Sequence, residues 1–185
     1  MRDDATISQR TATDLLREQH AEVKSLFSQV IDAQGEARAE LFDCLRAAMA
    51  VHETAEEVVI YPQLRELGGG DVADARIAEE SEAKQALADL EKLGPDGVGF
   101  GPKLLSLKQA VLAHAEAEET TVFPKIEQGC DDAQQRLLGE HIEVAEHLAP
   151  NHPHPHGPDS ALGNVLVGPF ERMADFVRDK LSRDR

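Results

Sequence analysis

The sequence is short of aromatic residues and cysteine. It has no tryptophan, one tyrosine and two cysteines among 185 residues. Two cysteines are too few for a disulfide framework, so a packed core must hold the fold, and a chain of this length can form one. The abundance of alanine, leucine and glutamate, together with the scarcity of aromatic and β-branched runs, favours helices over sheets.

Positive charge and long apolar runs are also scarce. Aspartate and glutamate number 35 against 19 lysines and arginines, which gives a formal net charge of -16. Such a surface repels phosphates, so we expect no nucleic-acid partner and no binding to anionic membranes. No apolar run approaches the roughly 20 residues that a membrane-spanning helix needs. The polar start Met1-Arg2-Asp3-Asp4 lacks the apolar region of a secretory signal, and we expect a cytoplasmic protein.

The apolar residues repeat with helical spacing in four long segments. Gly68-Gly69-Gly70 and Gly94-Pro95 mark where two of these segments end. Because the connections are short, consecutive helices should be antiparallel neighbours. The sequence therefore predicts an all-α fold, an antiparallel up-down-up-down four-helix bundle. Its helices are expected at about residues 13–31, 36–67, 72–93 and 103–128.

A different pattern follows the fourth helix. We divide the chain into a bundle at residues 1–128 and a C-terminal extension at 129–185 that packs on the bundle. Prolines recur every second or third position in 150–158, which excludes a helix there. The extension is therefore expected to hold a helix at 131–148, this histidine- and proline-rich segment, and a terminal helix at about 168–181.

One motif occurs twice. The stretches His52–Pro62 and His114–Pro124 share histidine, alanine, two glutamates and an aromatic-proline pair at identical offsets, beginning 62 positions apart. An internal duplication of a helix pair explains this repetition.

The spacing within the motif has a physical meaning. Residues four apart lie on the same helix face, so His52 points with Glu56, and His114 points with Glu118. Both pairs continue the apolar stripes of their helices and should face the interior of the bundle. A buried carboxylate is costly unless it is paired or bound to a metal. The duplicated motif therefore predicts a metal site inside the bundle.

The other two helices each place one candidate ligand at the same depth. His20 lies near the middle of the first apolar stripe, and Glu80 lies between Ile77 and Ala83 on the third. We interpret both as metal ligands. For Glu80 an alternative stays open, in which it lies at the solvent edge or pairs with Lys84, one turn further along.

At these residues the chain resembles the hemerythrin-like (HHE cation-binding) family. The resemblance covers about Asp14 to Gln128 and includes the segment Leu15–His20 of the first helix as well as both copies of the motif. It implies a four-helix bundle around two irons, an oxo- or hydroxo-bridged di-iron centre. It further implies that Glu56 and Glu118 bridge the metals, and that His20, His52 and His114 are terminal ligands.

The third helix departs from the family pattern. Glu80 and Lys84 stand where the resemblance leads us to expect histidines. The centre is thus richer in oxygen donors, which stabilise higher oxidation states. We therefore do not expect reversible oxygen carriage. Occupancy by one metal, and manganese or zinc in place of iron, stay open.

Three functions are compatible with this pattern. The leading one is a non-heme di-iron protein that binds or processes dioxygen, peroxide or nitric oxide, as an enzyme or as a binding protein. The second is a non-enzymatic module that senses or buffers iron or another metal. The third is a metal-free helical interaction protein. We expect a monomer or a weak homo-oligomer.

Overall fold

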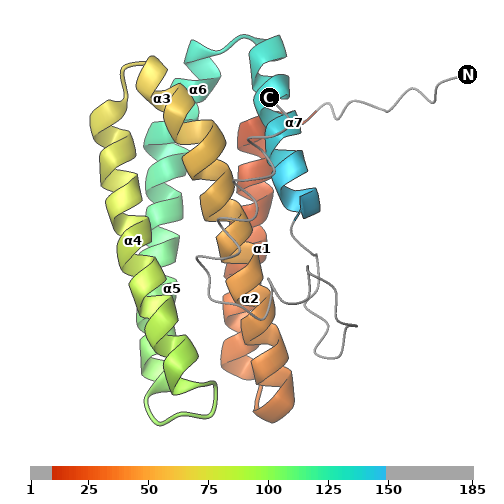
Figure 1. Cartoon of the computed structure of the whole chain (residues 1–185), viewed down its shortest axis with the longest axis vertical. Coiled ribbons are helices and arrows are strands. Elements are labelled where there is room, and N and C mark those ends of the chain that lie inside the picture. Colours follow the sequence, from red (N-terminus) through yellow and green to blue (C-terminus); the bar gives the residue numbers. More distant parts are fainter. Residues whose placement is uncertain (1–9, 149–185) are drawn as a thin grey trace, which may run out of the picture.

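The computed structural model describes residues 10–148, except for the side chains of 145–148, and every regular element in that range is helical. Four long rods run up, down, up and down, and a fifth, shorter helix lies beside them (Figure 1). This confirms the predicted all-α bundle. The first rod is α1 (Ala12–Asp32) and the third is α4 (Gly70–Leu93). The second rod consists of α2 (Gly35–Ala55), η1 (Glu56–Ile60) and α3 (Tyr61–Glu66). The fourth rod consists of α5 (Phe100–Ala117), η2 (Glu118–Val122) and α6 (Phe123–Gly129). The shorter helix beside the rods is α7 (Asp132–Leu148).

Local sequence signals fix where the rods begin and end. The Thr11 hydroxyl accepts a hydrogen bond from the backbone N–H of Asp14 at 3.2 Å, and the Asp14 carboxylate accepts one from the Thr11 N–H, which makes a capping box for α1. Gly68 and Gly94 follow the second and third rods with φ of 74°, a conformation that glycine adopts without strain. These are the glycines that marked helix ends in the sequence.

The interior has three layers along the bundle axis. One apolar layer includes Leu16, Ile60 and Ile126, and a second includes Phe27 and Leu104. Between them lies a buried polar layer. It holds His20, His52, Glu56, Glu80 and Glu118, each 9% exposed or less. Because each of the four long rods contributes to all three layers, the packing on either side of the polar layer fixes its position.

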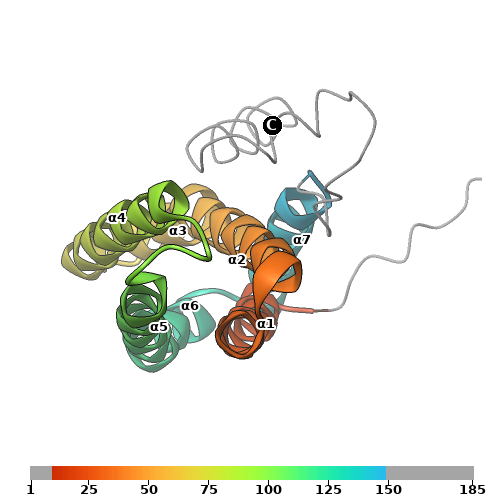
Figure 2. The same ribbon diagram turned by 90° about the horizontal axis from the view of Figure 1, so that it is seen from below.

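Helix α7 lies against α1 and α2, as Figure 2 shows from the end of the bundle. Ile142 is fully buried at this contact, and a Cβ on Gly139 would lie 2.6 Å from the carbonyl oxygen of Arg10. The helix predicted at 131–148 is thus present. The predicted segments at 150–158 and 168–181 lie outside the described residues.

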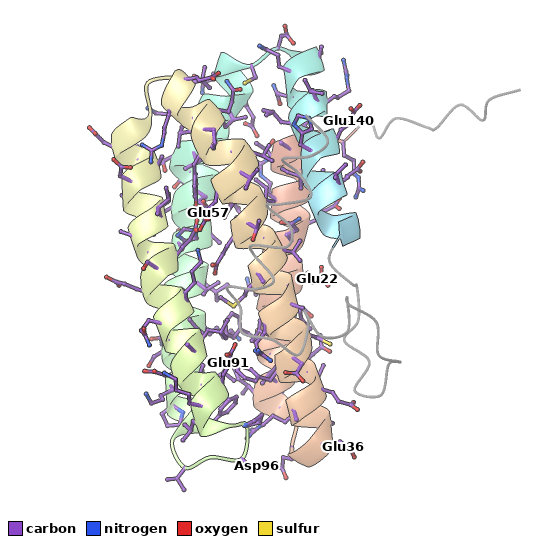
Figure 3. All side chains as sticks on the ribbon, in the orientation of Figure 1. Glu22, Glu36, Glu57, Glu91, Asp96 and Glu140 are labelled. Atoms are coloured by element: carbon purple, nitrogen blue, oxygen red, sulfur yellow. The ribbon has the colours of Figure 1, made fainter. Side chains whose placement is uncertain are left out.

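The surface of the bundle is acidic. Figure 3 labels Glu22, Glu36, Glu91, Asp96 and Glu140, which are spread from one end of the molecule to the other. Among the described residues, no helix has the length and apolar composition to cross a membrane.

Candidate metal centre

Both copies of the duplicated motif contain a π-helical turn. The backbone N–H of Tyr61 donates to the carbonyl of Glu56, and that of Phe123 donates to the carbonyl of Glu118, each five residues earlier. In a regular α-helix, residues five apart point about 140° away from each other. The wider π-turn reduces this angle, so each glutamate and the aromatic residue after it face the same interior. The sequence predicted uninterrupted α-helices here, which is wrong at these two turns.

The six residues predicted from the sequence as ligands lie in two overlapping clusters. In each cluster, one potential ligand atom from every residue lies within 4.8 Å of the others. The first cluster contains two histidines and the second contains one. The carboxylates of Glu56 and Glu118 belong to both. The first cluster is His20, His52, Glu56 and Glu118, and the second is Glu56, Glu80, His114 and Glu118.

Each histidine is oriented through its Nδ1 atom. His20 Nδ1 lies 2.8 Å from a Glu119 carboxylate oxygen, and His114 Nδ1 lies 2.9 Å from a Glu79 carboxylate oxygen. His52 Nδ1 lies 2.8 Å from the amide oxygen of Gln19. An acceptor at Nδ1 places the proton there and leaves Nε2 free to bind a metal.

The three Nε2 atoms point to the shared glutamates. His20 Nε2 and His114 Nε2 lie 3.4 and 3.3 Å from Glu118 Oε2. His52 Nε2 lies 3.2 Å from Glu56 Oε2. Two donors about 2.1 Å from one ion lie about 3.0 to 3.4 Å apart at octahedral or tetrahedral angles. The observed separations therefore fit atoms that share a metal.

Several polar atoms at the centre lack a hydrogen-bond partner among the described residues. Within the described part of the chain, both carboxylate oxygens of Glu56, one each of Glu80 and Glu118, and Nε2 of His20 and His114 are buried without a hydrogen bond. Buried polar groups are almost always satisfied, and unpaired carboxylates are costly. A cation bound between the two clusters would satisfy these atoms. The donor set of imidazole nitrogens and carboxylate oxygens fits iron, manganese and zinc.

The electrostatics of the second cluster are strongly coupled. Burial, together with the nearby Glu118 and Glu80 carboxylates, raises the pKa of Glu56 well above its usual range. Burial also raises the pKa of Glu80 to about 7. Burial would raise the pKa of Glu118 as well, but the adjacent imidazoles of His114 and His20 hold it well below its usual range. Burial opposes a charge on His114, yet the adjacent Glu118 carboxylate raises its pKa to about 9.

His52 behaves differently from His114. Burial, with a smaller contribution from the neighbouring His20, lowers the pKa of His52 to about 3. At neutral pH this ring is therefore uncharged and can offer a lone pair to a metal. The hydrogen-bond partner of His52, Gln19, is uncharged, which agrees with a neutral His52 ring.

Sequence reasoning missed Tyr61. The residue is 1% exposed, and its hydroxyl donates to the carboxylates of Glu80 and Glu118, the latter at 2.8 Å. Burial and the surrounding carboxylates raise the pKa of Tyr61 far above its usual value, so the phenol keeps its proton. The signal was present in the sequence, since Tyr61 is the aromatic residue of the first motif copy where the second has Phe123.

Lys84 contacts Glu80, as the alternative interpretation of Glu80 required. It also contacts two other carboxylates. Its ammonium lies 3.6 Å from Glu80 and 3.5 Å from the buried Glu53, and it also binds Glu57. Figure 3 shows Glu57 at about mid-height of the bundle, between α2 and α4. Glu80 is nevertheless 2% exposed and not at the solvent edge. Its Oε2 atom faces the Lys84 ammonium, and its Oε1 atom accepts a hydrogen bond from Tyr61.

A cavity of about 710 Å³ opens onto the centre. It runs along α4 and α5 and reaches His20, His52, Glu80 and His114, among other residues. The remaining lining is mainly apolar or small, including Val23, Met49, Ala83, Leu107 and Ala110. Small molecules can therefore reach the polar layer from this side of the bundle.

Comparison with known proteins agrees with this geometry. A sequence model of the family described as "Hemerythrin HHE cation binding domain" matches residues 11–126. A solved structure of a hemerythrin HHE cation-binding domain-containing protein from Mycobacterium kansasii superposes with a TM-score of 0.70 at 24% identity, covering 90% of this chain and 99% of that one. At this identity the likeness concerns the fold. A protein of Nostoc sp. named DNA nickase is 27% identical over 134 residues, which are 72% of this chain but only 38% of the relative.

Proposed function

Because the chain belongs to the hemerythrin HHE cation-binding domain family, we propose that its polar layer holds two metal ions, in the first instance iron, and that the centre binds or processes dioxygen, peroxide or nitric oxide. The observation that carries this proposal is the pair of overlapping clusters sharing Glu56 and Glu118. Paired carboxylates and histidines from facing helices are the usual way in which a helical bundle binds two metals.

The residues present have separate tasks in this proposal. Glu56 and Glu118 hold both ions, His20 and His52 complete one site, and His114 and Glu80 complete the other. A bound di-iron centre supplies the redox chemistry towards dioxygen, peroxide or nitric oxide, while the protein sets coordination and access.

The surroundings of the centre have tasks of their own. The phenol of Tyr61 keeps a proton beside Glu80 and Glu118. The cavity along α4 and α5 admits the small ligand.

The oxygen-rich second site favours processing over carriage. Only His114 brings nitrogen there, since Glu80 replaces one histidine and Lys84 is held by three carboxylates. Carboxylate ligands stabilise the oxidised metal, so a reduced form that rebinds oxygen reversibly is disfavoured.

Ligand variants and metal analysis test the proposal together. The wild-type chain from iron-replete expression is expected to contain about two irons and to absorb in the near-ultraviolet and visible range. His20→Ala and Glu80→Ala should each lose one metal, while Glu118→Ala should lose both, because Glu118 belongs to both clusters. A wild-type chain without bound transition metal would overturn the proposal. Equal stoichiometry in all three variants would overturn the assignment of residues.

A second candidate, a metal sensor or buffer, is favoured by one observation. Both oxygens of the buried Glu56 carboxylate lack a hydrogen-bond partner among the described residues, so metal binding should change helix stability strongly. Turnover assays divide the two candidates. Catalytic loss of peroxide or nitric oxide supports processing, whereas a large metal-dependent rise in melting temperature without turnover supports sensing.

We do not extend the activity in the Nostoc relative's name to this chain. The chain spans well under half of that protein, and its own net charge of -16 opposes binding to a phosphate backbone. We keep the expectation that nucleic acid is not a partner.

A further inference from the structure

The cavity beside the centre is much larger than a small oxidant requires. Its volume is about 710 Å³, whereas a water molecule in the liquid takes up about 30 Å³, and peroxide or nitric oxide is of similar size. Pockets that bind organic molecules typically measure about 300 to 1,000 Å³. The volume therefore matches an organic ligand.

The shape and lining of the cavity narrow the class of ligand. Lining residues on α4 extend from Arg76 to Asp89, which corresponds to about 20 Å of helix. The walls carry Val23, Met49, Ala83 and Ala110. An elongated apolar chain fits a long cavity with small and aliphatic walls.

Arg76 supplies a charged end to this cavity. One of its nitrogens, Nη2, donates to Glu79 at 2.7 Å, and the side chain is only 14% exposed. Its Nε and Nη1 atoms are buried and have no hydrogen-bond partner among the described residues. Buried guanidinium donors without an acceptor are costly, so Arg76 keeps unused hydrogen-bonding capacity and a positive charge beside the cavity.

Four of the five acidic residues that line the cavity have a partner, Glu53 through Lys84 at 3.5 Å, and the fifth, Glu82, is exposed. Glu79 is held between Arg76 and His114. Asp89 faces Lys103 at 4.0 Å, and Glu80 contacts Tyr61 and Lys84.

We propose that this cavity binds a long-chain carboxylate, with its acid group on Arg76 and its apolar chain between α4 and α5. Arg76 lies four residues before Glu80 on α4, so the acid end lies one helical turn from the candidate centre. This ligand goes beyond the proposed function, since none of the small oxidants needs such a cavity. Its binding can be measured separately from metal binding.

Titration calorimetry of the purified full-length chain with tetradecanoate tests the acid end. We expect saturable binding of one molecule per chain. Arg76→Met should weaken tetradecanoate binding at least tenfold and have little effect on binding of 1-tetradecanol, which lacks the charge. Arg65→Met is the matched control, because Arg65 makes a similar ion pair with Asp74 at 2.6 Å but does not line the cavity. This control should bind tetradecanoate as the wild type does.

A second pair of variants tests the apolar walls. Ala110→Trp should abolish binding of both probes by filling the cavity, whereas Gln109→Trp, at the neighbouring exposed position outside the lining, should not. Metal content measured in parallel separates loss of the cavity from loss of the centre. A wild-type chain that binds no tetradecanoate would overturn the proposal. Undiminished binding by Arg76→Met or Ala110→Trp would overturn it as well.

Discussion

Tyr61 and Phe123 occupy the same position in the two copies of the motif, yet only Tyr61 brings a hydroxyl to the carboxylates at the centre. Both side chains are buried, with 1% and 0% exposure. Phe123 instead stacks on the ring of His20, with centroids 5.6 Å apart, and carries the Arg17 guanidinium 5.2 Å above its own ring centroid. The duplicated scaffold therefore supports one half of the centre by ring stacking and the other half by a hydrogen bond.

Tyr61→Phe tests this asymmetry by making the first motif copy resemble the second. The ring volume is kept, but Glu80 and Glu118 lose their hydrogen-bond donor. Loss of such an outer partner typically weakens metal binding by about 10- to 100-fold. We expect the weaker of the two metals to be released at lower chelator concentration, with the helical circular dichroism unchanged. Identical chelator titrations of variant and wild type would contradict this role.

The carboxylate partners of the histidines give a second prediction. Glu119→Gln and Glu79→Gln keep an acceptor near Nδ1 of His20 and His114 but remove the charge that makes each ring a stronger donor. Each variant should bind metal about tenfold more weakly in competition with a chromophoric chelator. Glu116→Gln, on an exposed neighbouring position, is the control and should leave affinity unchanged. If all three variants behaved alike, the partners would have no influence on the metal.

The stability of the metal-free chain should fall as pH rises from about 6.5 to 9. The pKa of Glu80 is about 7 in the folded chain against 4.5 unfolded, so its contribution is complete below 4.5 and lost as pH rises through 7. The pKa of His114 is about 9 against 6.5, so its contribution is lost as pH rises through 9. Both changes have the same sign in this window, and together they are worth on the order of 2 kcal/mol.

The metal-loaded chain should show the opposite dependence, because metal binding requires deprotonated ligands and strengthens as pH rises. Melting temperatures of chelator-treated and metal-loaded samples at pH 6.5 and 9 measure both slopes. His52 does not disturb the comparison, since its lowered pKa affects stability only below about 6.5. A metal-free chain that melts higher at pH 9 than at 6.5 would disprove the assignment of these groups.

The contact of α7 with the start of α1 depends on Gly139. Replacing it with alanine would place a Cβ 2.6 Å from the Arg10 carbonyl oxygen, and because that atom belongs to the backbone, the helix must move away. We expect Gly139→Ala to destabilise the chain by about 1 to 3 kcal/mol in urea unfolding, despite alanine's better helix propensity. At Gly101 on α5 an added Cβ would meet nothing within 4 Å, so Gly101→Ala should be neutral or slightly stabilising.

Much of the fold could be predicted because several independent sequence signals agree on the same helices. Apolar spacing defines the rods, and glycines mark their ends near Gly68 and Gly94. The family resemblance, confirmed by the match over residues 11–126, rests on the same duplicated motif. Glu56 and Glu118 could be placed at the centre because a step of four residues points the same way in any regular helix.

Other features could not be predicted because they depend on a departure from the regular helix or on contacts between distant rods. A helical wheel with uniform α geometry turns Tyr61 away from Glu56, and only the π-turn brings it back. The ion pairs of Lys84 with Glu53 and Glu57 depend on how α4 packs against α2 and η1. The residue spacing within α4 carries no information about that packing. The division of the chain at residues 128 and 129 stays a prediction.

The two π-turns also bear on how the duplicated motif arose. A π-turn arises when one residue is inserted into an α-helix, and here it begins at the glutamate of both motif copies, Glu56 and Glu118. Two independent insertions at the same offset are a less economical explanation than one. Under the duplication inferred from the repeated motif, the ancestral helix pair already contained the insertion when it was copied, and Tyr61 and Phe123 diverged afterwards.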